Sequence, residues 1–241
     1  MDKHYTYFLI LVASLAGPLA LSFDNKVSFY KKWRYVFKAM LLPAFFYIVW
    51  DIIFTHLNIW HFNPAYITGY KIINLPVEEV LFFFVVPYCC LFIYECVCCY
   101  LPGLTIKFAD VILKILAAIL LLAGLIFIKR NYTSSTFIFT SLFIASLYFK
   151  NKLFKEFNAG AFLISYVIIL IPFLIVNGFL TSIPVVLYDN FQNLSVRIYT
   201  IPIEDIFYGM LLTLLNTVIY DRLKNRGTSF SQPLTNTAFS K

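Results

Sequence analysis

The chain has 241 residues, of which 61% are hydrophobic, 20% are aromatic and only 13% are charged. A soluble domain is about 45–50% apolar and about 25% charged, so this composition excludes a soluble globular protein and indicates an integral membrane protein. The formal net charge of +7 does not indicate nucleic-acid binding, because no soluble basic segment with interleaved aromatic residues occurs. The basic residues instead lie in short loops between apolar runs, as membrane topology requires.

Seven apolar runs approach the roughly 20 residues that a helix needs to cross a bilayer. We interpret the first run as a retained helix rather than a signal peptide, because it is long enough to span. The fifth run is the shortest. The predicted spans are residues 5–22, 37–55, 78–97, 108–128, 134–149, 160–179 and 203–220.

An acidic motif repeats along the chain. Leu75–Glu79 reads Leu-Pro-Val-Glu-Glu, and Ile201–Asp205 reads Ile-Pro-Ile-Glu-Asp 126 residues later. Further pairs at this offset are Asp51 with Asn177, Phe62 with Tyr188, Ile72 with Ile198, and Tyr94-Glu95 with Tyr220-Asp221. Spans 1–3 therefore correspond to spans 5–7. Because span 4 turns the chain once more, we predict parallel repeats about an axis along the membrane normal.

The predicted fold class is all-α integral membrane, with about seven transmembrane helices in two three-helix repeats joined by a connector. We assign residues 1–107 to the first repeat, 108–130 to the connector, 131–224 to the second repeat and 225–241 to a polar, disordered tail. The tail is rich in Ser, Thr and Asn, which cannot bury a core.

The basic residues predict an orientation. If the loop between spans 1 and 2 is cytoplasmic, thirteen of the nineteen Lys and Arg residues face the cytoplasm and five face the other side. Cytoplasmic loops carry the excess of positive charge, so we predict an outer N-terminus and a cytoplasmic C-terminus. A bacterial inner membrane is the expected location.

The acids of the repeated motif are candidate catalytic groups. Carboxylates at membrane depth are costly and are usually functional. Glu78 and Glu79 precede Phe82 and Phe83 on one helix, and a carboxyl against aromatic rings tends to keep its proton. This makes each a candidate general acid. The second copy offers Glu204 and Asp205.

Other polar and aromatic residues fall at the same predicted membrane face. Their rings have two open interpretations: the interfacial aromatic belt of any membrane protein, or stabilisation of a developing cation. The candidates for tuning the acids or lining a pocket are Trp50, Asp51, Trp60, Phe62, Asn63, Tyr66, Phe82, Phe83, Asn177, Tyr188, Arg197 and Tyr208.

We predict no metal site. The five cysteines lie in or just after one apolar run, without nearby histidine and without the spacing of zinc ligands, so we interpret them as small hydrophobic residues. His56 and His61 lie near the interface, but nothing in the sequence completes a metal site around them.

The motifs resemble those of the membrane lycopene cyclases of the heterodimeric type, with both subunit-like halves on one chain as in the cyclase domain of fungal bifunctional carotenoid enzymes. The resemblance covers about residues 5–222. It rests on Trp50-Asp51, Trp60–Asn63, Tyr66, Gly69, Leu75–Glu79, Phe82-Phe83 and Tyr94-Glu95, and on Asn177-Gly178, Leu180-Thr181, Tyr188, Arg197, Ile201–Asp205 and Tyr208-Gly209. The connector, the tail and Asp189 match nothing in the family pattern.

The resemblance implies a lycopene β-cyclase that adds and removes a proton and needs no cofactor. Its substrate would be lycopene or a related linear carotene drawn from the bilayer, with membrane lipid around it. Association with other enzymes of the pathway is left open. Glu78 and Glu204 are the first choice for the acid and base because they are identical in the repeat, followed by Glu79 and Asp205.

A proton-coupled transporter on parallel repeats remains the alternative, with the same carboxylates as a proton relay. A retinal photoreceptor is disfavoured, because the seventh span, residues 203–220, contains no Lys for a Schiff base.

Overall fold

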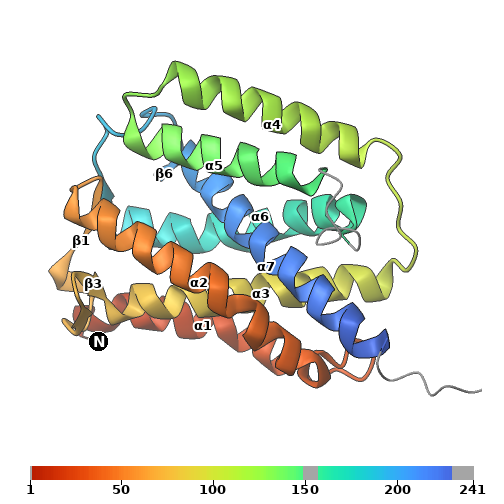
Figure 1. Cartoon of the computed structure of the whole chain (residues 1–241). Helices are drawn as coiled ribbons and strands as arrows, with labels where there is room; N and C mark the ends of the chain where they lie inside the picture. The colour runs from red at the N-terminus through yellow and green to blue at the C-terminus, as the bar shows by residue number, and fades with distance from the viewer. Residues whose placement is uncertain (1, 149–156, 230–241) are drawn as a thin grey trace, which may run out of the picture.

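The computed structural model describes residues 2–148 and 157–229, and this part of the chain forms seven α-helices that run roughly side by side (Figure 1). Every predicted span is present as a helix. The helices are α1 (Thr6–Leu21), α2 (Trp33–His56), α3 (Val77–Tyr100), α4 (Ala109–Ile126), α5 (Asn131–Leu147), α6 (Ala159–Ser182) and α7 (Ile203–Ser229). Short 3-10 turns are η1 (Lys3–Tyr5), η2 (Phe29–Lys32) and η3 (Pro64–Tyr66).

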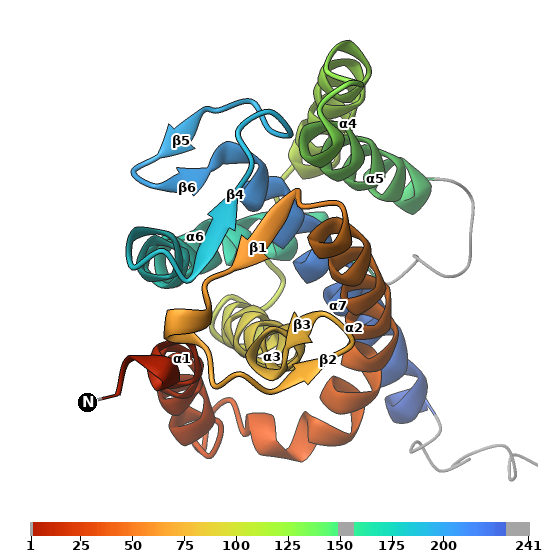
Figure 2. The same cartoon turned by 90° about the vertical axis from the view of Figure 1, so that its left-hand side faces the viewer.

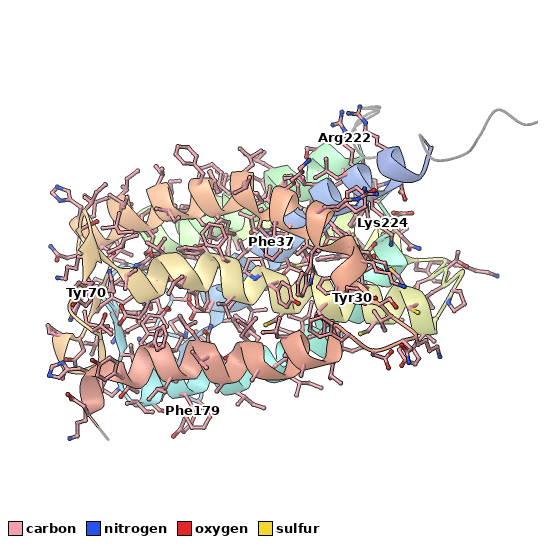
Figure 3. All side chains as sticks on the ribbon, turned by 90° about the horizontal axis from the view of Figure 1, so that it is seen from below. Tyr30, Phe37, Tyr70, Phe179, Arg222 and Lys224 are labelled. Atoms are coloured by element: carbon pink, nitrogen blue, oxygen red, sulfur yellow. The ribbon has the colours of Figure 1, made fainter. Side chains whose placement is uncertain are left out.

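Six helices of the described part are long and apolar enough to cross a membrane; α5, with 17 residues, is shorter. Large apolar side chains such as Phe37 and Phe179 are about half exposed on the sides of the bundle, while Arg222 and Lys224 lie at the end opposite Tyr70 (Figure 3). An apolar surface of this kind suits a bilayer and not water. The chain is a multi-pass membrane protein, as the composition predicts.

The last helix extends further than expected. α7 continues to Ser229, into the segment 225–241 that the composition predicts to be a disordered tail. The rest of that segment, from residue 230, lies outside the described residues.

Three two-stranded ribbons close one end of the bundle (Figure 2). The sequence analysis did not predict them. β1 (Trp60–Phe62) pairs with β4 (Val186–Tyr188), β2 (Lys71–Ile72) with β3 (Leu75–Pro76), and β5 (Arg197–Ile198) with β6 (Ile201–Pro202), all antiparallel. The motif prolines are the last strand residues, and α3 and α7 begin at the next residue. Proline suits that position because the first turn of a helix has no use for its missing N–H.

The backbone repeats with the sequence. Ile73 and Tyr199, 126 residues apart, hold φ angles of 61° and 57° in the turns of the two hairpins. A positive φ is strained for a β-branched or bulky side chain, so it persists only where the surroundings impose it. The same unusual conformation at the same place in both halves shows that the hairpins are equivalent.

Reciprocal hydrogen bonds define the axis that relates the halves. At the ribbon end, Asn63 N–H donates to Val185 O and Asp189 N–H donates to Ile59 O, both at 2.9 Å. At the other end, the Tyr94 hydroxyl donates to Asp221 at 2.7 Å and the Tyr220 hydroxyl donates to Glu95 at 2.6 Å. In each pair, a shift of 126 residues exchanges the partners. An axis through both pairs runs along the helices, so the predicted parallel repeats are confirmed.

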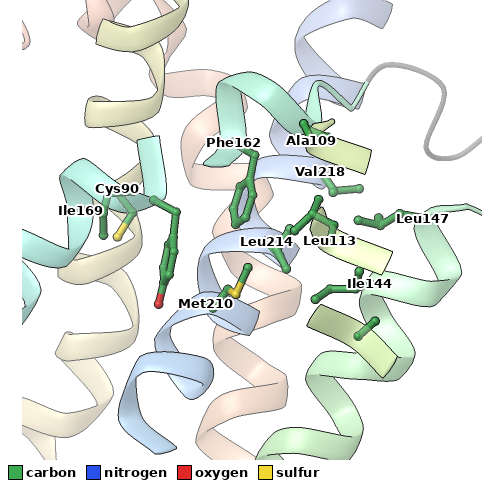
Figure 4. Close-up of a cluster of buried hydrophobic side chains, with 13 residues drawn as sticks. Cys90, Ala109, Leu113, Ile144, Leu147, Phe162, Ile169, Met210, Leu214 and Val218 are labelled. Atoms are coloured by element: carbon green, nitrogen blue, oxygen red, sulfur yellow. The ribbon is translucent and has the colours of Figure 1, made fainter. Parts of the chain in front are cut away.

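Each half packs against the other. α2 contacts α7 and α6 contacts α3, while α1 and α5 cover α3 and α7 of their own halves. One core cluster joins Cys90 of α3, Leu113 of α4, Ile144 of α5, Phe162 of α6 and Leu214 of α7 (Figure 4). The connector α4 packs mainly on α5. Since the main core is shared, the two halves form one folded unit.

The end opposite the ribbons depends on one buried carboxylate. Glu95 is 1% exposed, accepts from the Tyr220 hydroxyl, and forms ion pairs with Lys32 and Lys224, whose side chains are 26% and 28% exposed. The three cross-links tie α3 to η2 and α7, and therefore tie one half to the other.

We expect Glu95→Gln to lower the free energy of unfolding by about 1–3 kcal/mol, because two ammonium groups lose their ion pair with Glu95 but remain partly hydrated. Thermal unfolding of the protein in detergent micelles would measure this. The control is Asp110→Asn, which removes a charge at an exposed position and should change stability by less than about 0.5 kcal/mol. Equal shifts in the two variants would contradict the role of Glu95.

Candidate active site

A cavity of about 220 Å³ lies among α1, α3, α6 and α7, beneath the β1–β4 ribbon. Its lining is mostly apolar and aromatic, and its acids come from both halves: Asp51, Glu79 and Asp205. All three side chains are buried. The two acidic motifs therefore contribute to one cavity.

Glu79 and Asp51 form a carboxyl pair. Glu79 lies in the first turn of α3 and accepts a 2.6 Å hydrogen bond from the Tyr7 hydroxyl of α1. Asp51, near the end of α2, accepts from the indole N–H of Trp60. Its other oxygen, Oδ2, receives no donor from the described residues, and the two carboxyls line the same cavity and interact electrostatically with each other. Carboxyls in such contact can share one proton.

Asp205 has different surroundings. It occupies the position of Glu79 in the second half and accepts two phenolic hydrogen bonds, from Tyr132 at 2.5 Å and from Tyr188 at 2.9 Å. Burial first, and then the nearby Asp205 carboxylate, raise the pKa of Tyr188 well above its ordinary value. The Tyr188 hydroxyl therefore stays protonated and remains a donor.

Two of the three cavity acids, Glu79 and Asp205, lie in the first turns of α3 and α7. At this position the free N–H groups and the helix dipole stabilise negative charge. The sequence places the acids there by ending each hairpin with proline immediately before the helix. Local chain chemistry therefore explains why carboxylates are tolerated at this depth.

Glu78 and Glu204 occupy another environment. Both are fully buried, but neither lines the cavity. Glu78 Oε1 accepts from Thr68 N–H and Glu204 Oε1 accepts from Leu194 N–H, each at 2.7 Å, and Glu204 also accepts from Thr133 at 2.6 Å. The second oxygen of each acid receives no donor from the described residues. These glutamates hold the loops that precede the hairpins.

The structure divides the other predicted site residues into two groups. Those that line the cavity with the acids are Trp60, Phe62, Phe82, Asn177, Tyr188 and Tyr208. Those that do not line it are Trp50, Asn63, Tyr66, Phe83 and Arg197.

The second group has structural contacts. Trp50 and Phe83 lie in an aromatic cluster with Tyr47, and Asn63 accepts from Ala65 N–H at the start of η3. Arg197 donates to Thr200 O and to Asn190, both at 2.7 Å, and so braces its hairpin. Asp189, which matched nothing in the sequence analysis, accepts from Phe191 N–H at 2.9 Å. These side chains shape the ends of the bundle without facing the cavity.

Sequence reasoning missed three hydroxyl donors: Tyr7, Tyr132 and Thr133. Each lies near the start of the first helix of its repeat, far along the chain from the acid it contacts. A signal was present, because Thr6-Tyr7 and Tyr132-Thr133 occupy equivalent positions at the offset of 126. Three of these four residues, Tyr7, Tyr132 and Thr133, contact buried acids.

The cavity extends away from the acids along α3 as far as Ile93. Ile93 lies 14 positions after Glu79, which corresponds to about 21 Å along the helix axis at 1.5 Å per residue. Cys89 and Cys90 line this deep part, in keeping with their interpretation as small hydrophobic residues. No cluster of three or more His, Cys, Asp or Glu that might hold a metal occurs within residues 2–148 and 157–229.

The fold and cavity define a class: a multi-pass membrane protein whose two parallel repeats direct carboxyl groups into one apolar, elongated pocket. The family model described as Lycopene cyclase matches residues 4–97 and 129–223, which together make up most of the chain. The chain belongs to the lycopene cyclase family, and it is therefore a carotenoid cyclase that acts on lycopene. The two matched segments coincide with the two repeats. A comparison with curated proteins found no match, and neither did a comparison with solved structures.

The loop-holding role of Glu204 generates a prediction. Glu204→Gln keeps an acceptor for Leu194 N–H and Thr133, so its stability should stay near that of the wild type. Glu204→Leu leaves both donors buried without a partner and should lower the free energy of unfolding by about 1–3 kcal/mol. Thermal unfolding in detergent distinguishes the two variants; equal stability would contradict this role.

Proposed function

We propose that the protein is a lycopene β-cyclase, which converts the linear ends of lycopene into β rings by adding and removing a proton. One observation carries the proposal: a carboxyl pair and a doubly hydrogen-bonded carboxylate, from different halves, face one apolar cavity. A proton relay for transport would need polar groups along a path through the membrane, and the deep lining is apolar instead.

The reaction balances without a redox partner. Protonation of the terminal double bond forms a C–H bond and leaves a tertiary cation. The π electrons of a double bond further along the chain then form the ring C–C bond, and the positive charge moves to a ring carbon. Loss of a proton from the neighbouring ring carbon leaves the ring double bond of the β end group. One proton is gained and one is lost, so the product is an isomer.

The carboxyl pair is our candidate for the acid. Asp51 and Glu79 are buried together, and the donors that reach them among the described residues, the Tyr7 hydroxyl and the Trp60 indole N–H, are uncharged. One proton shared between the two carboxyls is therefore the stable arrangement. Tyr7 and Trp60 hold the two carboxyls in place from either side. The equivalent of Asp51 in the second half is Asn177, so only the first half carries such a pair.

Asp205 is our candidate for the base. Its two phenolic donors hold the carboxyl group in place, and in its ionised form this group can accept the ring proton or stabilise the positive charge until that proton leaves. Trp60, Phe82, Tyr188 and Tyr208 present rings around the same cavity. Ring faces attract a cation, and an apolar wall excludes the water that would trap it.

The test compares adjacent acids. In bacteria that accumulate lycopene, the wild-type protein should produce cyclised carotenoid. Glu79→Gln, Asp51→Asn and Asp205→Asn should each lower the rate by about 10²–10⁴-fold, the usual contribution of a positioned acid or base. Pigment analysis by chromatography, normalised to protein in the membrane, is the measurement.

The matched controls are Glu78→Gln and Glu204→Gln, which carry the same change one residue away. Both should retain activity within about fivefold of the wild type, because they face the loops. Unchanged lycopene from the wild type would overturn the proposed function. Loss of activity in the controls, with full activity in Glu79→Gln and Asp205→Asn, would reverse the assignment of roles.

We also propose that the acidic end faces away from the cytoplasm, as the distribution of basic residues indicates. Lys71 lies at the ribbon end and Lys31 at the opposite end, and both are exposed. In cells whose layers outside the inner membrane have been removed, a membrane-impermeant thiol reagent should label Lys71→Cys above the background of the parent protein. Lys31→Cys should be labelled only after lysis. The opposite pattern would invert the orientation.

A further inference from the structure

The bundle has a second groove that is the pseudo-symmetric counterpart of the cavity. It lies between α2, α5 and α7, with a volume of about 470 Å³. Four residues that line it correspond, at the offset of 126, to residues that line the deep part of the cavity. The pairs are Pro43 with Ile169, Phe46 with Pro172, Leu215 with Cys89, and Ile219 with Ile93.

The two spaces differ in what separates them from the acids. Beside the groove, Trp50 packs against Phe139 with ring centroids 5.1 Å apart and against Tyr208 at 5.4 Å. Tyr47 packs against Phe83 at 5.5 Å and Tyr208 at 4.7 Å. These rings form a continuous wall, and no acid lines the groove. The groove therefore ends at an aromatic plug formed by Tyr47, Trp50, Phe83 and Phe139.

At the equivalent positions of the open half, smaller residues replace most of this plug. Trp50 corresponds to Val176, Phe83 to Gly209, and Phe139 to Ala13. Val176 and Gly209 line the cavity. Residue size at three equivalent positions therefore opens one passage to the acids and closes the other.

The open passage lies between α1 and α6. These helices meet near the acids, where Tyr7 and Leu11 of α1 pack in one cluster with Leu180 of α6. Deeper in the bundle, Ser14 and Pro18 of α1 line the cavity and remain partly exposed. Pro172 of α6, on the opposite wall, lines the cavity and is exposed as well. In a bilayer this opening faces lipid.

We propose that the linear carotene reaches the acids sideways from the bilayer between α1 and α6, one end at a time, and that the aromatic plug closes the equivalent passage between α2 and α5. This rests on the proposed function for the identity of the substrate. The size of the cavity supports one end at a time: a cavity of about 150 Å³ in another protein holds one benzene ring, so the whole cavity, at about 220 Å³, cannot hold two ring ends together. The polyene lies along α3, in the deep part of the cavity.

A matched pair of substitutions tests the route. Ser14 lines the open passage and Ser146 lines the plugged groove, and each hydroxyl donates to a carbonyl of its own helix. Ser14→Phe should lower the cyclised fraction at least tenfold, whereas Ser146→Phe should match the wild type. Val176→Trp gives the open passage the same side chain that its equivalent position, Trp50, has in the plug. It should lower the cyclised fraction as Ser14→Phe does. Amounts of each variant in the membrane are compared by immunoblot.

A binding measurement separates the route from the chemistry. Lycopene that copurifies with the protein is quantified by absorbance, in a Glu79→Gln background that should not consume it. Ser14→Phe and Val176→Trp should each retain at least tenfold less lycopene than Ser146→Phe. Equal retention by all three, or equal loss in Ser146→Phe, would overturn the route even if the wild type is an active cyclase. A wild type that binds lycopene through this passage without cyclising it would overturn the proposed function alone.

Discussion

A carboxyl group inside a bilayer-embedded bundle is stable only if donors surround it or if it keeps its proton. This constraint organises both ends of the molecule. At one end Glu95 gathers Lys32, Lys224 and Tyr220 and joins the halves. At the other end the motif acids accept hydrogen bonds from the loops that precede the hairpins and from tyrosines at the starts of α1 and α5. The ribbons and the cavity are arranged around the satisfaction of these groups.

Equivalent positions in the two halves have different contacts. Glu79 and Asp205 occupy the same place in the two helices, yet the first contacts another carboxyl while the second accepts two phenol hydrogen bonds. A pseudo-symmetric backbone thus surrounds two equivalent acids with different hydrogen-bonding groups. In a symmetric dimer of identical chains, each of these environments would be imposed on both copies.

The sequence predicts the helices and the parallel halves because long apolar runs and a motif at a fixed offset leave few alternatives. It does not predict the ribbons, since strands of two or three residues such as Lys71–Ile72 carry no periodicity. Nor does it distinguish Glu78 from Glu79. Adjacent helix residues point about 100° apart, and which of them faces the cavity depends on how α3 packs. The donors Tyr7 and Tyr132 come from contacts more than seventy residues apart, which one sequence cannot reveal.

The connector α4 contributes to the core but supplies no residue to the cavity, and it lies outside the two matched segments. Its main consequence concerns assembly. By covalently joining the halves it replaces an encounter between two chains with an intramolecular one, at a high effective concentration. It also fixes the stoichiometry at one copy of each half, so two identical halves never compete for the same partner. The differences between the halves can then accumulate without loss of correct pairing.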